Sequence, residues 1–310
     1  MQKSIAVVGG ISGYGLADKL HTRGYKAALI CGREGEPGCD IADLLLVKDL
    51  SEHESILEFL YKADINEVVF GTGHIKAFYL AEYLQKSGIK VSIDPAKSLL
   101  AKDKYRYKLE LIKHNFLTPD FIFFDHSSTD INVNTILDHI SLPCVVKSNT
   151  DLIYPKKANS RFELEKAIQE LQNLKSEILI EEFIDGIEVT VPVKAAGKQA
   201  EAIMLSYYNK AKECQLYGFK DFTNQHLNTK QEREAMLLAS DVIQKTGIVG
   251  VARLDIMYKN ESYYILECNS VMVTGVHENQ LEYGMGFLAK ENIDFAELTI
   301  DNALTVFKRT

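Results

Sequence analysis

The sequence predicts an α/β fold in which an N-terminal doubly wound parallel sheet is followed by a two-lobed α+β region. Over roughly the first 95 residues, short β-rich apolar runs alternate with helical patterns, which is typical of parallel βαβ units. From residue 178 onward, short apolar runs follow one another with turns between them, which indicates an antiparallel sheet. A chain of 310 residues also exceeds one typical core, so we expect several lobes.

The expected elements divide the chain into domains at residues 1–98, 99–179 and 180–310. The first domain is expected to hold strands at residues 4–9, 26–30, 67–70 and 90–93. The second is expected to hold helices at residues 98–115 and 162–174 and strands at residues 121–124 and 143–147. A strand at 178–180 leads into the third, with strands at 188–193, 202–208, 250–258 and 263–268 and helices at 229–246 and 295–307.

Composition and charge favour a small-molecule partner. The formal net charge is −8, whereas nucleic-acid binding depends on clustered Lys and Arg side chains that displace counterions. The five cysteines are scattered without a two-residue gap, so we expect free thiols in a reducing compartment. The first residues form neither a signal-peptide pattern nor a membrane span. We therefore expect a cytoplasmic protein that contacts neither nucleic acid nor a membrane.

A glycine-rich turn follows the first apolar run, with glycines at Gly9, Gly10, Gly13 and Gly15. A dinucleotide-binding fingerprint needs glycines at its first, third and sixth positions, and Ser12 and Asp18 interrupt that spacing. A plain strand-to-helix turn is therefore favoured over a nicotinamide site. A third interpretation, of intermediate weight, is a loop that faces a substrate, with Tyr14 as a contact.

The strongest chemical signal is a pair of apolar runs that carry Arg253, Asp255, Glu267 and Asn269. A tight turn at residues 259–261 joins the runs, so we expect a β-hairpin. Alternate residues of a strand share one side of a sheet, so Glu267 and Asn269 point the same way and Asp255 can join them from the facing strand. Two carboxylates and an amide oxygen suit Mg²⁺ held jointly with phosphate oxygens. Arg253 is placed to stabilise a transferring phosphoryl group or a substrate carboxylate.

An exposed hairpin whose polar residues merely face water is the competing interpretation. The flanking residues are apolar, which predicts one buried face and one face that lines a site: Leu254, Ile256, Ile265 and Leu266. The constellation resembles the ATP-grasp superfamily, whose C-terminal lobe carries an Arg-x-Asp strand followed by a Leu-Glu-x-Asn strand. On this resemblance, the N-terminal sheet is a pre-ATP-grasp domain and the rest is the two-lobed ATP-grasp fold.

Three further motifs extend the resemblance toward D-alanine–D-alanine ligases and related carboxylate–amine ligases. The Asp-Lys pair that ends in Lys104 resembles the pair that the family carries before the lobe that covers ATP. Lys147 ends an apolar strand, and in the family the lysine at the end of such a strand touches the nucleotide phosphates. Residues 179–188 resemble the hinge strand, whose first acid and backbone meet the adenine. The nucleotide-binding residues implied there are Glu181, Glu182, Ile184 and Glu188.

Two departures from the family pattern concern the loops. No glycine-rich loop follows Lys147, although backbone amides approach phosphate closely only where side chains do not intervene. The lid is therefore expected to be shorter, stiffer or partly replaced by Lys156 and Lys157. The residues after Asn269 also lack the Pro-Gly turn of dipeptide ligases.

The resemblance implies a carboxylate–amine ligase that depends on ATP and Mg²⁺, or Mn²⁺ in its place, and forms an amide through an acyl phosphate with release of ADP and phosphate. It implies metal ligation by Asp255, Glu267 and Asn269, nucleotide binding by Lys104, and catalytic roles for Lys147 and Arg253. The partners would be a small carboxylate and an amine. A homodimer is the family expectation.

Alternatives and weaker candidates remain open at the sequence level. The chain could be a degenerate nucleotide-binding protein of the same fold without ligase turnover, or, less favoured, an NAD(P)-dependent oxidoreductase. His74 follows an expected parallel strand, where open α/β sheets bind ligands, but a histidine near a glycine turn is more often structural. His277 is a second substrate candidate. Lysines at 210, 212 and 220 lie in a polar stretch that is more simply a solvated loop.

Overall fold

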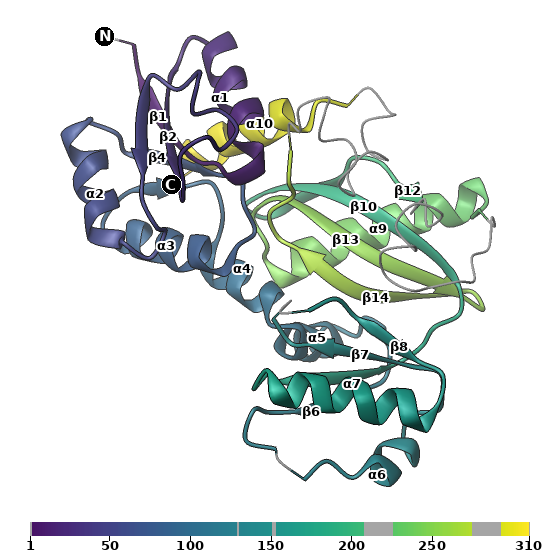
Figure 1. Ribbon diagram of the computed structural model, residues 1–310. Coiled ribbons are helices and arrows are strands. Elements are labelled where there is room, and N and C mark those ends of the chain that lie inside the picture. Colours follow the sequence, from purple (N-terminus) through teal and green to yellow (C-terminus); the bar gives the residue numbers. More distant parts are fainter. Residues whose placement is uncertain (1, 129, 151–152, 208–225, 275–292, 310) are drawn as a thin grey trace.

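A computed structural model describes residues 2–128, 130–150, 153–207, 226–274 and 293–309. The chain folds around three sheets, and each sheet has a hydrophobic core of its own (Figure 1). In the described ranges, no helix combines the length and the apolar character needed to cross a bilayer.

The N-terminal sheet is parallel throughout, with the strand order β3-β2-β1-β4-β5. Its strands are β1 (Ser4–Val8), β2 (Lys26–Cys31), β3 (Leu44–Val47), β4 (Glu67–Phe70) and β5 (Lys90–Val91). The order reverses direction between β1 and β4, and the turns after these two strands lie at the same edge of the sheet. Ligands of open α/β sheets bind in the crevice at this kind of switch point.

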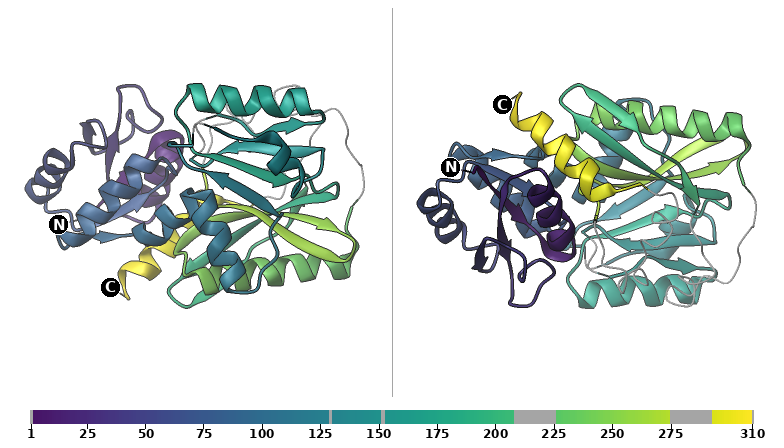
Figure 2. Two further views of the ribbon diagram at one scale, coloured as in Figure 1. Left: turned by 90° about the horizontal axis from the view of Figure 1, so that it is seen from below. Right: turned by 90° about the horizontal axis from the view of Figure 1, so that it is seen from above.

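Helices cover both faces of this sheet because successive strand residues alternate between them. Ile5 and Val7 pack against helices α1 (Gly13–Thr22) and α10 (Phe295–Phe307), while Ala6 and Val8 face α2 (His53–Lys62) and α3 (Ile75–Lys86). Figure 2 shows α10, in yellow, alongside α1, in purple. The last helix in the sequence therefore completes the core of the first sheet.

Two helices connect the N-terminal sheet to the rest of the chain, where the sequence pattern predicts one helix at residues 98–115. The expectation of a single helix is wrong, because α4 (Pro95–Lys102) ends at Asp103 and α5 (Lys104–Lys113) begins directly after it. Asp103 has an extended backbone, and its carboxylate accepts a hydrogen bond from the amide of Arg106. An aspartate in this position is a helix N-cap, which starts a new helix rather than continuing the old one.

The central sheet is antiparallel, with the order β6-β9-β7-β8. It comprises β6 (Phe121–Phe124), β7 (Cys144–Ser148), β8 (Lys156–Ala158) and β9 (Ile178–Glu182), with helices α6 (Val133–Leu137) and α7 (Arg161–Asn173). One face, with Val146 and Ile180, packs against α7. The opposite face carries Lys147 and Glu181, because these residues alternate with the buried apolar ones.

The C-terminal sheet is also antiparallel, with the order β11-β10-β13-β14 and β12 paired to β10. Its elements are β10 (Ile187–Ala196), β11 (Gln199–Ala202), β12 (Ser206–Tyr207), α9 (Thr229–Thr246), β13 (Gly250–Lys259) and β14 (Ser262–Asn269). Val191, Leu254 and Ile265 pack against α9 on one face. The other face is polar and is described below.

The structure confirms the predicted fold class, and the α9 and α10 bounds equal the predicted ones. The predicted continuous strand at residues 202–208 is wrong for residues 203–205, since β11 ends at Ala202 and pairing resumes at β12, and residue 208 lies outside the described residues. The prediction gave no bounds for several elements, among them β3, α2, α3, α6 and β8. The division into three domains stays a prediction, and α10 packs on the N-terminal sheet.

Close packing explains the glycines of the first loop. A Cβ atom on Gly13 would lie 2.3 Å from the carbonyl oxygen of Pro37, and one on Gly9 would lie 2.8 Å from the Cα of Gly13. Backbone atoms cannot move aside as a flexible side chain can. Contacts within the N-terminal domain therefore require glycine here, which supports the strand-to-helix turn.

Gly13→Ala should destabilise the protein by about 1–3 kcal/mol, because the added methyl overpacks a rigid contact. The measurement is the free energy of unfolding from urea titrations. Gly32→Ala is the matched control, since its Cβ would meet only the Glu36 side chain at 3.5 Å, and it should shift stability by less than about 0.5 kcal/mol. Equal stability of the Gly13→Ala variant and the wild type would contradict the packing explanation.

Candidate functional site

The C-terminal hairpin brings the predicted metal ligands together on one face. In the register of β13 and β14, Asp255 lies opposite Glu267 and Arg253 lies opposite Asn269. Residues that face each other across an antiparallel pair project to the same side. A register shift between Asp255 and Ile256 returns Ile256 to the side of Ile265, in the core against α9. The polar side faces away from α9.

Asp255 is held in place by two neighbours. The hydroxyl of Thr190 on β10 donates a hydrogen bond to Asp255 Oδ1 at 2.6 Å, and the Arg253 guanidinium donates one to Oδ2 at 3.0 Å. Burial raises the pKa of Asp255 to about 6 against the pull of Arg253, and the Glu267 carboxylate adds to the rise. Thr190 lies directly opposite Asp255 in the β10–β13 register, a long-range pairing that the sequence pattern did not reveal.

Glu267 has looser contacts. Its Oε2 lies 3.6 Å from Lys104 Nζ, and its Oε1 accepts a long hydrogen bond of 3.4 Å from Asn269. Burial opposes ionisation, but the positive charges of Lys104, Lys147 and Arg253 outweigh it and hold the pKa of Glu267 at about 2. The Glu267 side chain is 31% exposed, so a ligand can reach part of it.

The donor set fits a hard divalent cation. Among the described residues, no three His, Cys, Asp or Glu side chains lie together as metal ligands, and the set here is two carboxylates and one amide. Mg²⁺ prefers such oxygen donors and usually completes its shell with water and phosphate oxygens. Burial, and to a lesser degree the Glu267 charge, raise the pKa of Asp255, so a bound cation would favour the ionised carboxylate.

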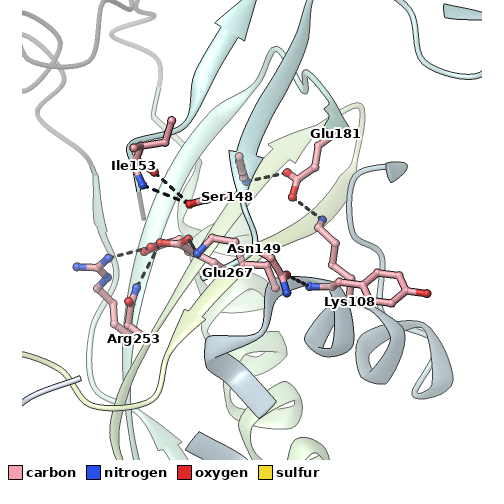
Figure 3. A network of polar contacts seen from close by, with 12 residues as sticks. Lys108, Ser148, Asn149, Ile153, Glu181, Arg253 and Glu267 are labelled. Atoms are coloured by element: carbon pink, nitrogen blue, oxygen red, sulfur yellow. Dashed lines mark hydrogen bonds and ion pairs between the residues drawn. The ribbon is translucent and has the colours of Figure 1, made fainter. Parts of the chain in front are cut away.

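A second charged cluster lies on the face of the central sheet opposite α7. Glu181, 2% exposed, lies between two buried lysines, with Lys147 Nζ 2.7 Å from Oε2 and Lys108 Nζ 3.2 Å from Oε1. Burial alone would raise the pKa of Glu181, but the two ammonium groups hold it below its ordinary value. Figure 3 shows this cluster beside Glu267 and Arg253 of the neighbouring sheet.

Lys108 is a site residue that the sequence analysis did not single out. Its amine donates a hydrogen bond of 2.6 Å to the hydroxyl of Thr118, which in turn donates one of 2.9 Å to the carbonyl of Ile265 on β14. The signal available in the sequence was its spacing, because Lys108 falls four residues after Lys104, on the same face of a helix. Through its contacts with Glu181 and Thr118, Lys108 connects α5 with the central sheet and the C-terminal sheet.

The residues predicted to bind the nucleoside lie along the link between the two sheets. Glu182 ends β9 half-buried, Ile184 is 4% exposed, and Glu188 is half-buried on β10 opposite Met257. Glu188 and Thr190 alternate on the same side of β10, so Glu188 shares the polar face with Asp255. Glu181 instead contacts the two lysines. Its adenine contact, like the other nucleoside roles, stays a prediction.

The remaining candidates are dispersed. His74 is the N-cap of α3 and accepts a hydrogen bond from the amide of Lys76 at 3.2 Å, which is a structural role. Tyr14 lies half-buried in the first turn of α1. His277 and the three loop lysines are outside the described residues. Of the proposed lid lysines, Lys156 pairs with Glu170 on α7, while Lys157 Nζ lies 3.8 Å above the ring of Phe183.

A pocket joins the hairpin to the N-terminal sheet. Its lining includes Lys104, Glu267 and Asn269, together with Gly73 after β4 and Val271 after β14. Val271 also packs into the core of the N-terminal sheet. The carboxyl edge of that sheet therefore lies beside Glu267 and Asn269.

These features define an ATP-grasp fold, in which two α+β lobes face each other across a lysine- and carboxylate-lined site. Residues 113–275, more than half of the chain, match the family model described as "D-ala D-ala ligase C-terminus". The chain belongs to this family. The resemblance to ATP-grasp ligases of this kind is confirmed.

Relatives of known name agree with this assignment. The chain is 30% identical to a D-alanine–D-alanine ligase of Coprothermobacter proteolyticus over 193 residues, which cover 58% of this chain and 62% of that protein. It is 30% identical over 191 residues to the ligase of Pelagibacter ubique, covering 56% and 59%. The chain therefore matches about three fifths of the length of these relatives.

Solved structures match over nearly the whole chain. The Bacillus anthracis D-alanine–D-alanine ligase in complex with ATP gives a TM-score of 0.72 at 19% identity and covers 100% of this chain and 99% of that one. An N5-carboxyaminoimidazole ribonucleotide synthetase from Thermotoga maritima gives 0.73 at 17% identity, covering 99% and 76%. At these identities the likeness establishes the fold.

Lys108 predicts a pH dependence of stability. Burial lowers the pKa of Lys108 to about 8 although Glu181 opposes the shift, whereas its ordinary value is 10.5. Between these values the unfolded chain binds more protons than the folded one, so stability should rise with pH. Relative to Lys108→Met, the wild type should gain up to about 1.4 kcal/mol per pH unit above pH 8.

Urea titrations of both proteins at pH 7, 8, 9 and 10 measure this difference, and titratable groups distant from Lys108 cancel. Lys113→Met, which removes an exposed lysine of the same helix, should change the free energy of unfolding by less than about 0.5 kcal/mol at neutral pH. A constant difference between wild type and Lys108→Met across the series would show that Lys108 keeps its proton.

Proposed function

We propose that this protein is an ATP- and Mg²⁺-dependent carboxylate–amine ligase that forms an amide through an acyl phosphate and releases ADP and phosphate. The observation that carries the proposal is the register of the hairpin, which sets Asp255 against Glu267 and Arg253 against Asn269 on one polar face. The family match and the ATP-bound structure of a ligase with this fold support it.

The chemistry explains why such a site suits this reaction. A carboxylate is a poor electrophile, so the acid must gain a good leaving group before an amine can attack. Transfer of the γ-phosphoryl group supplies that group, and it needs positioning and charge neutralisation more than covalent help. Mg²⁺ or Mn²⁺ would supply positive charge that offsets the negative charge of the phosphates.

Each side chain takes a role that its position allows. Asp255, Glu267 and Asn269 would hold the cation, with the partly exposed Glu267 as the accessible ligand. Lys104 and Lys147 would turn from their carboxylate partners toward the phosphates. Arg253 would bind the oxygens of the acyl phosphate, because a guanidinium presents parallel donors to such a group.

The acid and the amine would bind in the pocket beside the hairpin. That pocket reaches Gly73, at the carboxyl edge of the N-terminal sheet, and it would have to widen for a substrate, because its volume of about 20 Å³ fits little more than a water molecule. Amino acids are the first substrates to test, since the curated relatives are D-alanine–D-alanine ligases.

Removal of either carboxylate should stop turnover. Asp255→Asn and Glu267→Gln keep the size of the side chain but lose the charge that a cation needs, so we expect a fall in rate of about 100-fold or more. The measurement is release of ADP and phosphate from Mg-ATP over pairs of amino acids and small carboxylates. Cys31→Ser, in the core of the N-terminal sheet, should retain the wild-type rate.

The same assay separates the alternative functions. Mg-ATP binding without stimulated ADP release under any substrate pair would indicate a nucleotide-binding protein without ligase turnover. A rise in melting temperature with NAD(P) but none with Mg-ATP would indicate an oxidoreductase instead. Wild-type rates in Asp255→Asn or Glu267→Gln would mean that the metal assignment is wrong.

A further inference from the structure

Asn149 is a buried residue between the two segments that carry the candidate phosphate lysines. It is 1% exposed and comes two residues after Lys147, directly beyond β7. The backbone carbonyl of Asn149 accepts a hydrogen bond from the backbone amide of Lys104 at 3.3 Å. The side-chain oxygen Oδ1 accepts one from the backbone amide of Tyr105 at 2.8 Å. These are among the first amides of α5, which have no carbonyl partner inside their own helix.

The side-chain amide group of Asn149 is used as well. Nδ2 donates to Asp103 Oδ1 at 3.0 Å and to Glu177 Oε2 at 2.8 Å, and the backbone amide donates to the carbonyl of Glu177 at 3.1 Å. Asparagine supplies two donor hydrogens and an acceptor oxygen in one short side chain. A carboxylate of the same shape would lose both donors and place a third negative charge beside two others.

We propose that Asn149 is a positioning residue that fixes Lys104 relative to Lys147 and thereby sets the affinity of the site for the triphosphate of ATP. This inference rests on the proposed function. Three hydrogen bonds join Asn149 to the junction of α4 and α5, at Asp103, Lys104 and Tyr105. Asn149 acts through the lysines and does not itself hold the nucleotide.

The two lysines need different kinds of support. Lys147 lies within β7, where it pairs with Leu179 of β9, so the sheet already holds its backbone. Lys104 is the first residue of α5, and its Nζ lies 3.6 Å from Glu267 on the other sheet. A flexible lysine binds phosphate well only when its backbone is held, and small misplacements are costly in a preorganised site. Asn149 holds that backbone against the end of β7.

A double-mutant cycle on ATP affinity tests this inference. The dissociation constant of Mg-ATP is measured by calorimetry for the wild type, Asn149→Asp, Lys104→Met and the double variant. We expect Asn149→Asp to weaken binding about tenfold when Lys104 is present, and less than about twofold in the Lys104→Met background, where no lysine is left to misplace. The affinity for adenosine, which has no phosphate, should not change.

Two further variants control for folding and for the substitution itself. In Asn149→Asp/Glu177→Gln, the new glutamine amide can donate to the new aspartate, which restores one of the two lost contacts. The contact with Asp103 stays broken. We therefore expect this variant to fold and still to bind ATP weakly. This variant carries the cycle if Asn149→Asp alone does not fold. Asn159→Asp, an exposed asparagine that also donates to a glutamate, should bind ATP like the wild type.

The outcomes separate this inference from the proposed function. Equal losses of ATP affinity in both backgrounds, or an equal loss for adenosine, would overturn the positioning role alone. Wild-type ATP affinity in Asn149→Asp/Glu177→Gln would do the same. A wild-type chain that does not bind Mg-ATP would refute the proposed function and this inference with it.

Discussion

The buried carboxylate of Glu181 is the constraint on which the arrangement of the site depends. Removing a carboxylate from water costs several kcal/mol unless opposite charges and hydrogen bonds compensate. Lys147 comes from the same sheet, but Lys108 comes from α5, so the compensation holds α5 against the central sheet. The ring of Tyr105, also on α5, stacks on Phe123 of that sheet with centroids 4.0 Å apart.

Charge and packing together fix two polar surfaces relative to each other. The central sheet contributes lysine, and the C-terminal sheet contributes the carboxylate pair of Asp255 and Glu267. Helix α5 touches both, through the Lys108–Thr118 link to β14 and through the approach of Lys104 to Glu267. Positive and negative groups thus alternate across the site. A phosphate chain with its cation has the same alternation.

The sequence could predict what local periodicity encodes. The bounds of α9 follow from an amphipathic stripe between the cap residue Asn228 and the left-handed Gly247, and the shared face of Asp255 and Glu267 follows from strand alternation. Tertiary pairings could not be predicted in this way. Lys108 resembles any surface lysine of a helix, and only the fold brings it to Glu181. The helix break at Asp103 was missed because charged residues on either side continue a helical pattern.

Helix α10 has a consequence for how the chain reaches this fold. It covers the face of the N-terminal sheet that carries Ile5 and Val7, and Arg23, directly after α1, pairs with Glu297 and Asp301 of α10. During synthesis, that apolar face stays partly open until residues 295–307 emerge. Segments almost 300 residues apart therefore share one core, and the N-terminal sheet gains its full packing only when residues 295–307 dock on it.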